Sequence, residues 1–231
     1  MNQKDEALLF FDAIYLINLP ARKDRLNKWQ KSAKRINFQH PNFNLFKAIN
    51  GEELHNPAWK FQPGALGCLE SHLLILKEAR NKSYKNVLIF EDDFLFHRKF
   101  KKYLSDAIKE LPAKWDMFYL YSDHHEKPSE YSKNLVKCKV TIGGVAYAVN
   151  SNLYDFLIEE IEARDKQLDV VYASIHAKTD SFATRKNICI HYDGFSDILK
   201  EKTNYHRSRA WYMIRSLKTR IYKLIIFLSK I

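Results

Sequence analysis

Three consecutive carboxylates, Glu91, Asp92 and Asp93, follow the clearest strand pattern in the sequence, Asn-Val-Leu-Ile-Phe at residues 86–90. Like charges this close raise each other's pKa and disfavour the ionised state. A hard divalent cation relieves that repulsion, and Mg²⁺ or Mn²⁺ is commonly held by one or two carboxylates together with substrate phosphates. The triplet is therefore interpreted as half of a metal site that a phosphorylated ligand completes. The alternative is a solvated acidic loop.

A second candidate segment runs from Gly64 to His72 and reads Gly-Ala-Leu-Gly-Cys-Leu-Glu-Ser-His. Glycines that open a helix let a ligand or another backbone come close, and helix N-termini bind anions. The segment is neither a P-loop nor a dinucleotide fingerprint. The alternative is a tight turn followed by a helix that packs through Cys68 and His72.

Apolar runs that alternate with amphipathic stretches predict the elements that must position these residues. Strands are expected at residues 13–17, 43–49, 86–90, 116–121 and 145–149. Helices are expected at about residues 22–36, 68–80, 98–111 and 152–164. This alternation predicts a single α/β domain with a central, mainly parallel sheet flanked by helices. In such sheets ligands bind beyond the carboxyl ends of the strands, which is where Asn18-Leu19-Pro20 and the acidic triplet lie.

The composition is that of a globular protein. The 231 residues are 46% hydrophobic and 28% charged, with only 6 Gly and 6 Pro, which argues against a disordered or fibrous chain. Three widely spaced cysteines form neither a paired disulfide framework nor a zinc-type cluster, so a reduced, cytoplasmic setting is expected. The sequence shows no secretory signal and no apolar run of about 20 residues, so we expect a protein that is neither secreted nor membrane-spanning.

Residues 206–231 form a separate basic segment. The whole chain has a net charge of +11, and this segment carries seven basic residues and no acidic one. Its apolar residues follow three-four spacing, which predicts a basic amphipathic helix after a domain at residues 1–205. Such a helix suits an anionic membrane surface, and the alternative is packing on the protein's own core or on a second subunit. Charge confined to one segment disfavours nucleic-acid binding.

Six short motifs occur in order across about residues 13–198. They are Ile17-Asn18-Leu19 with Arg22, Asp24 and Arg25; Ala48 to Gly51; Gly64 to His72; Val87 to Asp93; Gly143 to Tyr147; and Gly194 to Ile198. Their types and order resemble glycosyltransferase family 25, which includes bacterial lipooligosaccharide galactosyltransferases and relatives of the collagen galactosyltransferases. Pro20-Ala21 and His191-Tyr192-Asp193 depart from the family pattern.

The resemblance implies a GT-A type fold and inverting transfer of a sugar, expected to be galactose, from a UDP-sugar. It implies a Mn²⁺ or Mg²⁺ ion held by Glu91 and Asp93, with His191 as a further candidate ligand or a buried structural histidine. Asp169 is the candidate base that deprotonates the acceptor hydroxyl, and Asp197 is the second candidate. The alternative for Asp169 is a helix N-cap.

The resemblance also implies a set of residues around the donor. For two of them, Arg22 and Arg25, the alternative interpretation is that they form the solvated face of the first helix. For Gly143-Gly144 the alternative interpretation is a simple turn. The full set is Asn18, Leu19, Arg22, Arg25, Gly67, Ser71, His72, Glu91, Asp92, Gly143, Gly144 and Ser196.

In this interpretation the cation offsets charge on the diphosphate leaving group while the anomeric centre becomes oxocarbenium-like. The expected acceptor is a lipid-linked oligosaccharide, and the expected location is the cytoplasmic face of the inner membrane. Two other functions remain open. A metal-dependent phosphoesterase or nucleotidyltransferase requires further His or Asp ligands beside the triplet, and a non-enzymatic basic protein requires salt-sensitive nucleic-acid binding.

Overall fold

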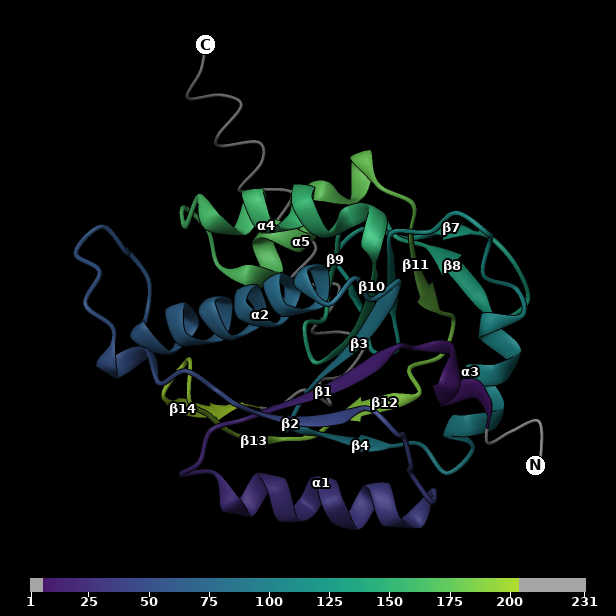
Figure 1. The fold of residues 1–231 in the computed structure, drawn as a ribbon, viewed down its shortest axis with the longest axis horizontal. Helices are drawn as coiled ribbons and strands as arrows, with labels where there is room; N and C mark the ends of the chain where they lie inside the picture. Colours follow the sequence, from purple (N-terminus) through teal and green to yellow (C-terminus); the bar gives the residue numbers. More distant parts are fainter. Residues whose placement is uncertain (1–5, 204–231) are drawn as a thin grey trace.

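The structure is a computed structural model that describes residues 6–203. One eight-stranded sheet lies between two layers of helices (Figure 1). The predicted helix at residues 206–231 and the predicted domain boundary at residue 205 lie outside the described residues. Within residues 6–203, no helix combines the length and the apolar character needed to cross a membrane.

The sheet has the spatial order β2-β1-β3-β10-β5-β11-β8-β7. Its strands are β1 (Ala13–Asn18), β2 (Phe43–Lys47), β3 (Asn86–Glu91), β5 (Met117–Tyr119), β7 (Ser129–Glu130), β8 (Leu135–Lys137), β10 (Ala146–Asn150) and β11 (Ser181–Thr184). Three strand pairs lie outside it: β4 (Phe94–Phe96) with β12 (Cys189–His191), β6 (Asp123–His124) with β9 (Thr141–Ile142), and β13 (Gly194–Ser196) with β14 (Glu201–Thr203).

The α-helices are α1 (Lys23–Arg35), α2 (Pro63–Asn81), α3 (Phe100–Ile108), α4 (Tyr154–Glu162) and α5 (Leu168–Ile175). Four short 3₁₀ helices complete the described elements: η1 (Glu6–Phe10), η2 (Gly51–Glu53), η3 (Ser151–Leu153) and η4 (His176–Lys178).

Most strands of the sheet point in one direction. β1 pairs in parallel with β2 and β3, and β5 pairs in parallel with β11. β10 and β8 run against their neighbours, so six of the eight strands share one direction. The predicted α/β fold with a mainly parallel sheet flanked by helices is confirmed.

Each face of the sheet carries its own apolar core. On β1, Ala13, Tyr15 and Ile17 pack with α2, α4 and α5, whereas Ile14 and Leu16 pack with α1 and α3. A strand covered on both faces has a continuous apolar run instead of alternation. This explains why the runs at residues 13–17 and 86–90 predicted buried strands correctly.

The helix that contains the glycine segment starts earlier than predicted. α2 begins at Pro63 instead of residue 68. Proline is favoured in a first turn, where its missing N–H needs no partner. Gly64 and Gly67 therefore lie inside the helix, and their interpretation as a turn ahead of it is wrong.

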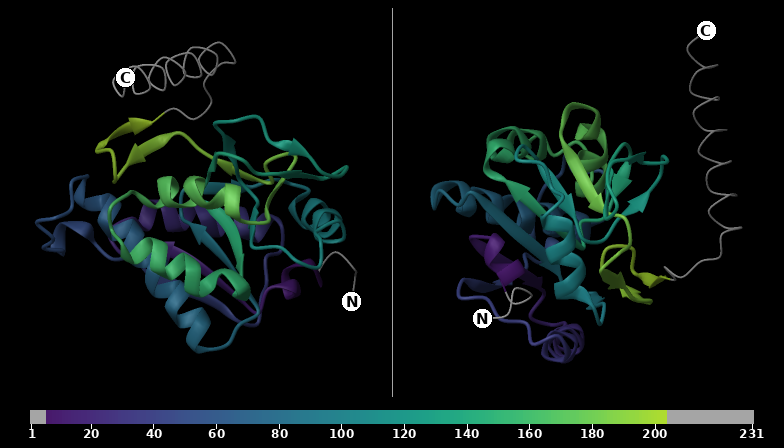
Figure 2. Two further views of the ribbon diagram at one scale, coloured as in Figure 1. Left: turned by 90° about the horizontal axis from the view of Figure 1, so that it is seen from above. Right: turned by 90° about the vertical axis from the view of Figure 1, so that its right-hand side faces the viewer.

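The chain after residue 149 contains strands that the sequence analysis did not predict. β11 lies in the main sheet, and β12 pairs with β4 so that His191 is the register partner of Phe94. The Tyr192 amide also donates to the Asp93 carbonyl oxygen at 3.3 Å. Figure 2 shows the following hairpin, β13–β14, on the outside of the domain. This return of the chain brings residues 191–197 next to the acidic triplet.

Candidate active site

A cleft of about 570 Å³ opens at the carboxyl ends of β1 and β3. Ten of the residues predicted to bind donor or metal, or to act as base, line it: Leu19, Arg22, Arg25, Ser71, His72, Glu91, Asp92, Asp93, Ser196 and Asp197. The other six predicted residues are not part of this lining: Asn18, Gly67, Gly143, Gly144, Asp169 and His191. The cleft therefore brings together most of the set, from segments far apart in the sequence.

Asp92, which follows β3, makes hydrogen bonds to β1 and α1. Its carboxylate accepts hydrogen bonds from Asn18 Nδ2 at 2.5 Å and from Arg25 Nη1 at 3.0 Å. Burial and the neighbouring Asp93 charge raise the pKa of Asp92 to about 6, although Arg25 and Asn18 oppose this. Asn18 thus acts through Asp92, since it is buried and does not line the cleft.

Asp93 is paired with two basic side chains. Its Oδ2 lies 3.2 Å from Arg25 Nη1 and 3.2 Å from His191 Nε2. Burial by itself would raise the pKa of Asp93, but His191 and Arg25 hold it below its usual range. Its Oδ1 is buried and has no hydrogen-bond partner among the described residues. Asp93 therefore presents an ionised carboxylate with one oxygen available to a cation.

Glu91 points toward α2 instead of α1. Its Oε1 lies 3.3 Å from His72 Nε2 and 3.9 Å from Cys68 Sγ. Burial, together with the charges of Asp93 and Asp169, raises the pKa of Glu91 to about 8. The three consecutive carboxylates thus occupy three different environments.

Arg22 and Arg25 face carboxylates and not solvent. Arg22 pairs with Asp24 at 3.0 Å and with Asp197, and Arg25 lies 3.3 Å from Asp197 Oδ2. Arg25 Nη2 also donates to the Phe195 carbonyl oxygen at 2.7 Å. Their side chains are 18% and 13% exposed, so the alternative of a solvated helix face is wrong for both.

Asp169 lies close to Glu91 through two glycines. The amides of Gly143 and Gly144 donate to Asp169 Oδ1 at 3.2 and 3.1 Å. A Cβ atom on Gly144 would lie 3.4 Å from both Asp169 Oδ1 and Glu91 Oε1. Gly143 has φ +151°, where its missing Cβ avoids the Tyr121 carbonyl oxygen. Asp169 is the second residue of α5 and Gln167 is the N-cap, so the N-cap alternative is wrong.

Gly67 and Ser71 hold α2 against residues 49–51. A Cβ atom on Gly67 would lie 2.4 Å from the Ile49 carbonyl oxygen and 2.5 Å from the Gly51 amide nitrogen. Ser71 Oγ accepts a hydrogen bond from the Ile49 amide at 2.9 Å and donates to the Gly67 carbonyl oxygen at 2.7 Å. Gly67 therefore serves helix packing, and the close approach predicted there is to backbone.

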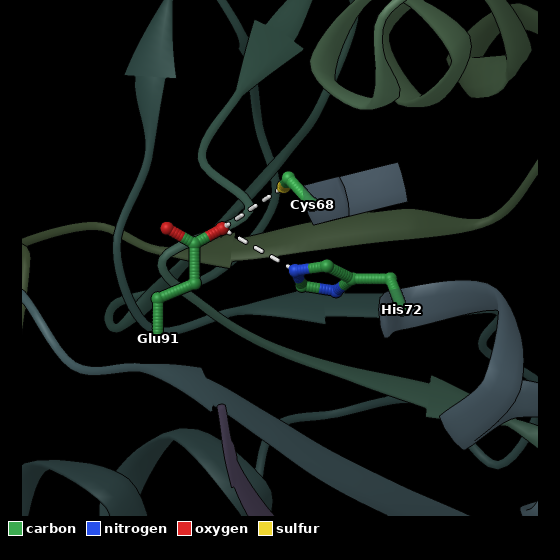
Figure 3. A group of neighbouring side chains, drawn as sticks. All are labelled: Cys68, His72 and Glu91. Carbon is green, nitrogen blue, oxygen red and sulfur yellow. Dashed lines mark hydrogen bonds and ion pairs between the residues drawn. The ribbon is translucent and has the colours of Figure 1, made fainter. Parts of the chain in front are cut away.

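Cys68, His72 and Glu91 form a compact group (Figure 3). Across residues 6–203, it is the one group of three metal-capable side chains whose ligand atoms all lie within 4.8 Å of one another. The predicted set of Glu91, Asp93 and His191 is divided, since His191 contacts Asp93 whereas Glu91 contacts α2.

The sequence analysis did not single out several residues of this site. Tyr147 OH lies 2.7 Å from His72 Nδ1, and Lys200 Nζ lies 3.1 Å from Glu52 Oε1 at the edge of the cleft. Tyr147 is fully buried in an apolar strand, and its hydroxyl was the only feature of the sequence that could have indicated a polar contact there. His124 contacts Thr141 Oγ1 at 2.8 Å and does not line the cleft, so it is not a further ligand beside the triplet.

A sequence model described as "Glycosyltransferase family 25 (LPS biosynthesis protein)" matches residues 11–149. The chain belongs to glycosyltransferase family 25. The matched region runs from β1 to β10 and includes the acidic triplet, the glycine segment of α2 and both arginines. Asp169, His191 and Asp197 lie beyond it.

Curated relatives in family 25 are much longer than this chain. Procollagen galactosyltransferase 2 of Homo sapiens is 29% identical over 128 residues, which is 48% of this chain and 20% of that protein. "Probable inactive glycosyltransferase 25 family member 3" of Bos taurus is 25% identical over 131 residues, which is 48% of this chain and 22% of that protein. The chain thus spans about a fifth of these relatives. One of them is named as probably inactive, so membership of the family does not by itself show activity.

Among solved structures, a glycosyltransferase involved in the glycosylation of the major capsid of PBCV-1 aligns with a TM-score of 0.49 and 12% identity. The alignment covers 89% of this chain and 98% of that one. A score of this size is too low to support a conclusion about function.

Proposed function

We propose that this family 25 chain is a metal-dependent, inverting glycosyltransferase that transfers a hexose, with galactose the first candidate, from a UDP-sugar to a glycan acceptor. The observation that carries the proposal is the Asp93 carboxylate, paired with Arg25 and His191, in a cleft of about 570 Å³ that Glu91 and two arginines also line. A cleft of about 300–1,000 Å³ is the size that small-molecule ligands occupy. The names of the procollagen galactosyltransferases support galactose as the first donor to test.

The residues present fit a hard divalent cation, Mn²⁺ or Mg²⁺. Such ions prefer oxygen ligands, and Asp93 Oδ1 is a buried oxygen without a hydrogen bond among the described residues. Asp93 would be the principal ligand; His191, which contacts Asp93, and Glu91, which contacts α2 in this structure, are the further candidates. When bound, the ion would offset negative charge on the departing diphosphate.

The two arginines have different tasks in this proposal. Arg25 is engaged by Asp92, Asp93 and Asp197, so it fixes the carboxylates in place. Arg22 lines the cleft at 18% exposure and adds positive charge where an anionic donor would bind.

Asp169 is the proposed base for the acceptor hydroxyl: it is not part of the cleft lining, but its Oδ1 and the Oε1 of the cleft residue Glu91 both lie 3.4 Å from the position of a Cβ atom on Gly144. Two backbone amides fix its Oδ1, which leaves Oδ2 as the atom that we assign to accept the proton. Asp197 is the weaker candidate because both arginines pair with its carboxylate.

The acceptor and the location are part of the same proposal. The family description names lipopolysaccharide biosynthesis, which supports a lipid-linked oligosaccharide as acceptor. We propose that residues 206–231, with seven basic residues and no acidic one, bind an anionic membrane surface. The enzyme would then work at the cytoplasmic face of the inner membrane.

The test is a panel of UDP-sugars with a lipooligosaccharide acceptor, scored by UDP release with Mn²⁺, with Mg²⁺ and with EDTA. We expect turnover with UDP-galactose that EDTA removes and added metal restores. Asp93→Asn should abolish transfer with an unchanged circular dichroism spectrum, because the amide keeps the shape and loses the charge. The matched control Asp155→Asn changes an exposed carboxylate that pairs only with Arg80 among the described residues, and it should keep full activity. Full activity of Asp93→Asn would refute the metal assignment.

A further inference from the structure

Cys68, His72 and Glu91 point toward one another (Figure 3), and all three line the cleft. Cys68 and His72 are four residues apart on α2 and therefore share one face of the helix, and Glu91 ends β3. Thiolate, imidazole and carboxylate together are a donor set that a borderline-soft ion such as Zn²⁺ accepts, whereas Mg²⁺ and Mn²⁺ prefer oxygen alone.

Two of the three spacings between these atoms are close to those of tetrahedral zinc. Bond lengths of about 2.3 Å to sulfur and about 2.1 Å to nitrogen and oxygen place neighbouring ligands about 3.3–3.4 Å apart for N and O and about 3.6 Å apart for S and O. The structure has 3.3 Å between His72 Nε2 and Glu91 Oε1, and 3.9 Å between Cys68 Sγ and Glu91 Oε1. The first spacing matches, the second is about 0.3 Å longer than the ideal value, and all three ligand atoms lie within 4.8 Å of one another.

We propose that Cys68, His72 and Glu91 form a binding site for one thiophilic divalent cation, Zn²⁺ being the probe of choice, separate from the hard-cation position at Asp93. All three residues line the cleft, so solvent can supply the fourth ligand. The site shares only Glu91 with the proposed donor metal.

A buried hydrogen-bond chain already orients the histidine. His72 Nδ1 lies 2.7 Å from Tyr147 OH, and Tyr147 OH lies 2.5 Å from Tyr172 OH. Metal-binding histidines almost always use the second ring nitrogen in such a contact, which fixes the ring and its tautomer. His72, Tyr147 and Tyr172 are fully buried, so Nε2 is held toward Glu91.

The charges around the group favour a cation. Glu91 Oε1 lies 3.9 Å from Cys68 Sγ, and both Glu91 Oε1 and Asp169 Oδ1 lie 3.4 Å from the position of a Cβ atom on Gly144, so two carboxylates adjoin the group. A coordinating thiol gives up its proton to solvent when it binds a divalent cation. The two positive charges then offset the Cys68 thiolate and the Glu91 carboxylate.

One consequence rests on the proposed function. An ion bound here would occupy Glu91 in its observed position against α2, so that Glu91 could not serve the proposed donor metal. We therefore expect Zn²⁺ to inhibit UDP-sugar turnover, whereas Mn²⁺ supports it.

The experiment titrates the full chain with Co²⁺, which replaces Zn²⁺ and reports on sulfur ligation by a near-ultraviolet charge-transfer band. We expect the band to saturate at one Co²⁺ per chain and to disappear on addition of Zn²⁺. Cys68→Ser should lose it, whereas the control Cys138→Ala, which changes a buried cysteine outside the cleft, should keep it. Tyr147→Phe should keep the band but weaken Co²⁺ binding about 10- to 100-fold.

A second measurement needs no variant. Zn²⁺ should protect Cys68 in the native protein from alkylation, as read by peptide mass spectrometry, and Mg²⁺ should not. No charge-transfer band in the native chain, or equal alkylation of Cys68 with and without Zn²⁺, overturns the inference. Neither readout needs sugar transfer, so the two proposals can fail separately. A protein that transfers sugar but shows no Co²⁺ band refutes only the Cys68 site. A protein that shows the band but transfers no sugar refutes only the proposed function.

Discussion

Replacing Gly67 by alanine tests whether α2 and residues 49–51 approach as closely as the structure shows. The added Cβ would lie 2.4 Å from the Ile49 carbonyl oxygen and 2.5 Å from the Gly51 amide nitrogen. Both are backbone atoms, so no side-chain rotation relieves the contact. Ile49 would have to retreat by about 0.6 Å to reach even the 3.0 Å that real Cβ contacts essentially never undercut.

Three effects set the size of the change. Overpacking of this kind costs about 1–3 kcal/mol. Retreat of Ile49 also stretches the 2.9 Å hydrogen bond from its amide to Ser71 Oγ, which is worth about 1 kcal/mol. Alanine offsets about 0.5–1 kcal/mol of this loss because it is the better helix former. We therefore expect Gly67→Ala to lower the free energy of unfolding by about 1–3 kcal/mol.

The assay is urea denaturation followed by tryptophan fluorescence, with the slope of the transition checked for constancy. Gly194→Ala is the control, since its nearest neighbouring atom would be 3.8 Å away, and it should change the free energy of unfolding by less than about 0.5 kcal/mol. Ser71→Ala should cost about 1 kcal/mol by itself. A Gly67→Ala protein as stable as the native chain, but with weakened UDP-sugar binding, would refute the packing role and restore Gly67 as a donor contact.

Three further outcomes are expected. Asp169→Asn should lower kcat about 10²- to 10⁴-fold with little change in donor KM, because the amide cannot take the acceptor proton; an equal or larger loss in Asp197→Asn would reverse the ranking of the two bases. Burial lowers the pKa of His176 to about 4, and the Thr141 amide donates to its Nδ1 at 3.3 Å. A histidine in the unfolded chain has a pKa of about 6.5. Between about pH 6.5 and 4 the unfolded state therefore binds more protons than the folded state. The free energy of unfolding then falls as the pH falls, by about 3 kcal/mol over this range. His176→Asn should flatten that part of the pH profile of urea unfolding, and an unchanged profile would contradict the assignment. Deletion of residues 206–231 should reduce binding to anionic liposomes and leave neutral ones unaffected; unchanged partitioning would remove the membrane proposal.

The central sheet and the position of the acidic triplet could be predicted from the sequence. Strands β1 and β3 are covered on both faces, so their apolar runs are continuous and easy to recognise. The rule that ligands bind beyond the carboxyl ends of strands then pointed to Glu91 to Asp93, and the cleft is lined by all three residues.

The position of residues 189–203 beside the acidic triplet could not be predicted in the same way. β12, β13 and β14 have three residues each, which is too short for a periodic pattern. His191 and Asp197 reach the site through tertiary pairing with β4 and with the arginines near the start of α1, across more than 90 positions of sequence. The resemblance to family 25 suggested both residues, but no local signal gave their contacts.

The different environments of the three carboxylates follow from strand alternation, which the sequence did contain. On β3, Ile89 packs on the face covered by α2, α4 and α5, and Phe90 packs on the face covered by α1 and α3. Successive side chains of a strand point to opposite faces, so Glu91 continues toward α2 and Asp92 continues toward α1. Their observed contacts agree, since Glu91 meets His72 whereas Asp92 meets Arg25. The pleat therefore separates the side chains of Glu91 and Asp92, whereas Arg25 Nη1 lies between Asp92 and Asp93 at 3.0 and 3.2 Å, so the three carboxylates line one cleft through different contacts.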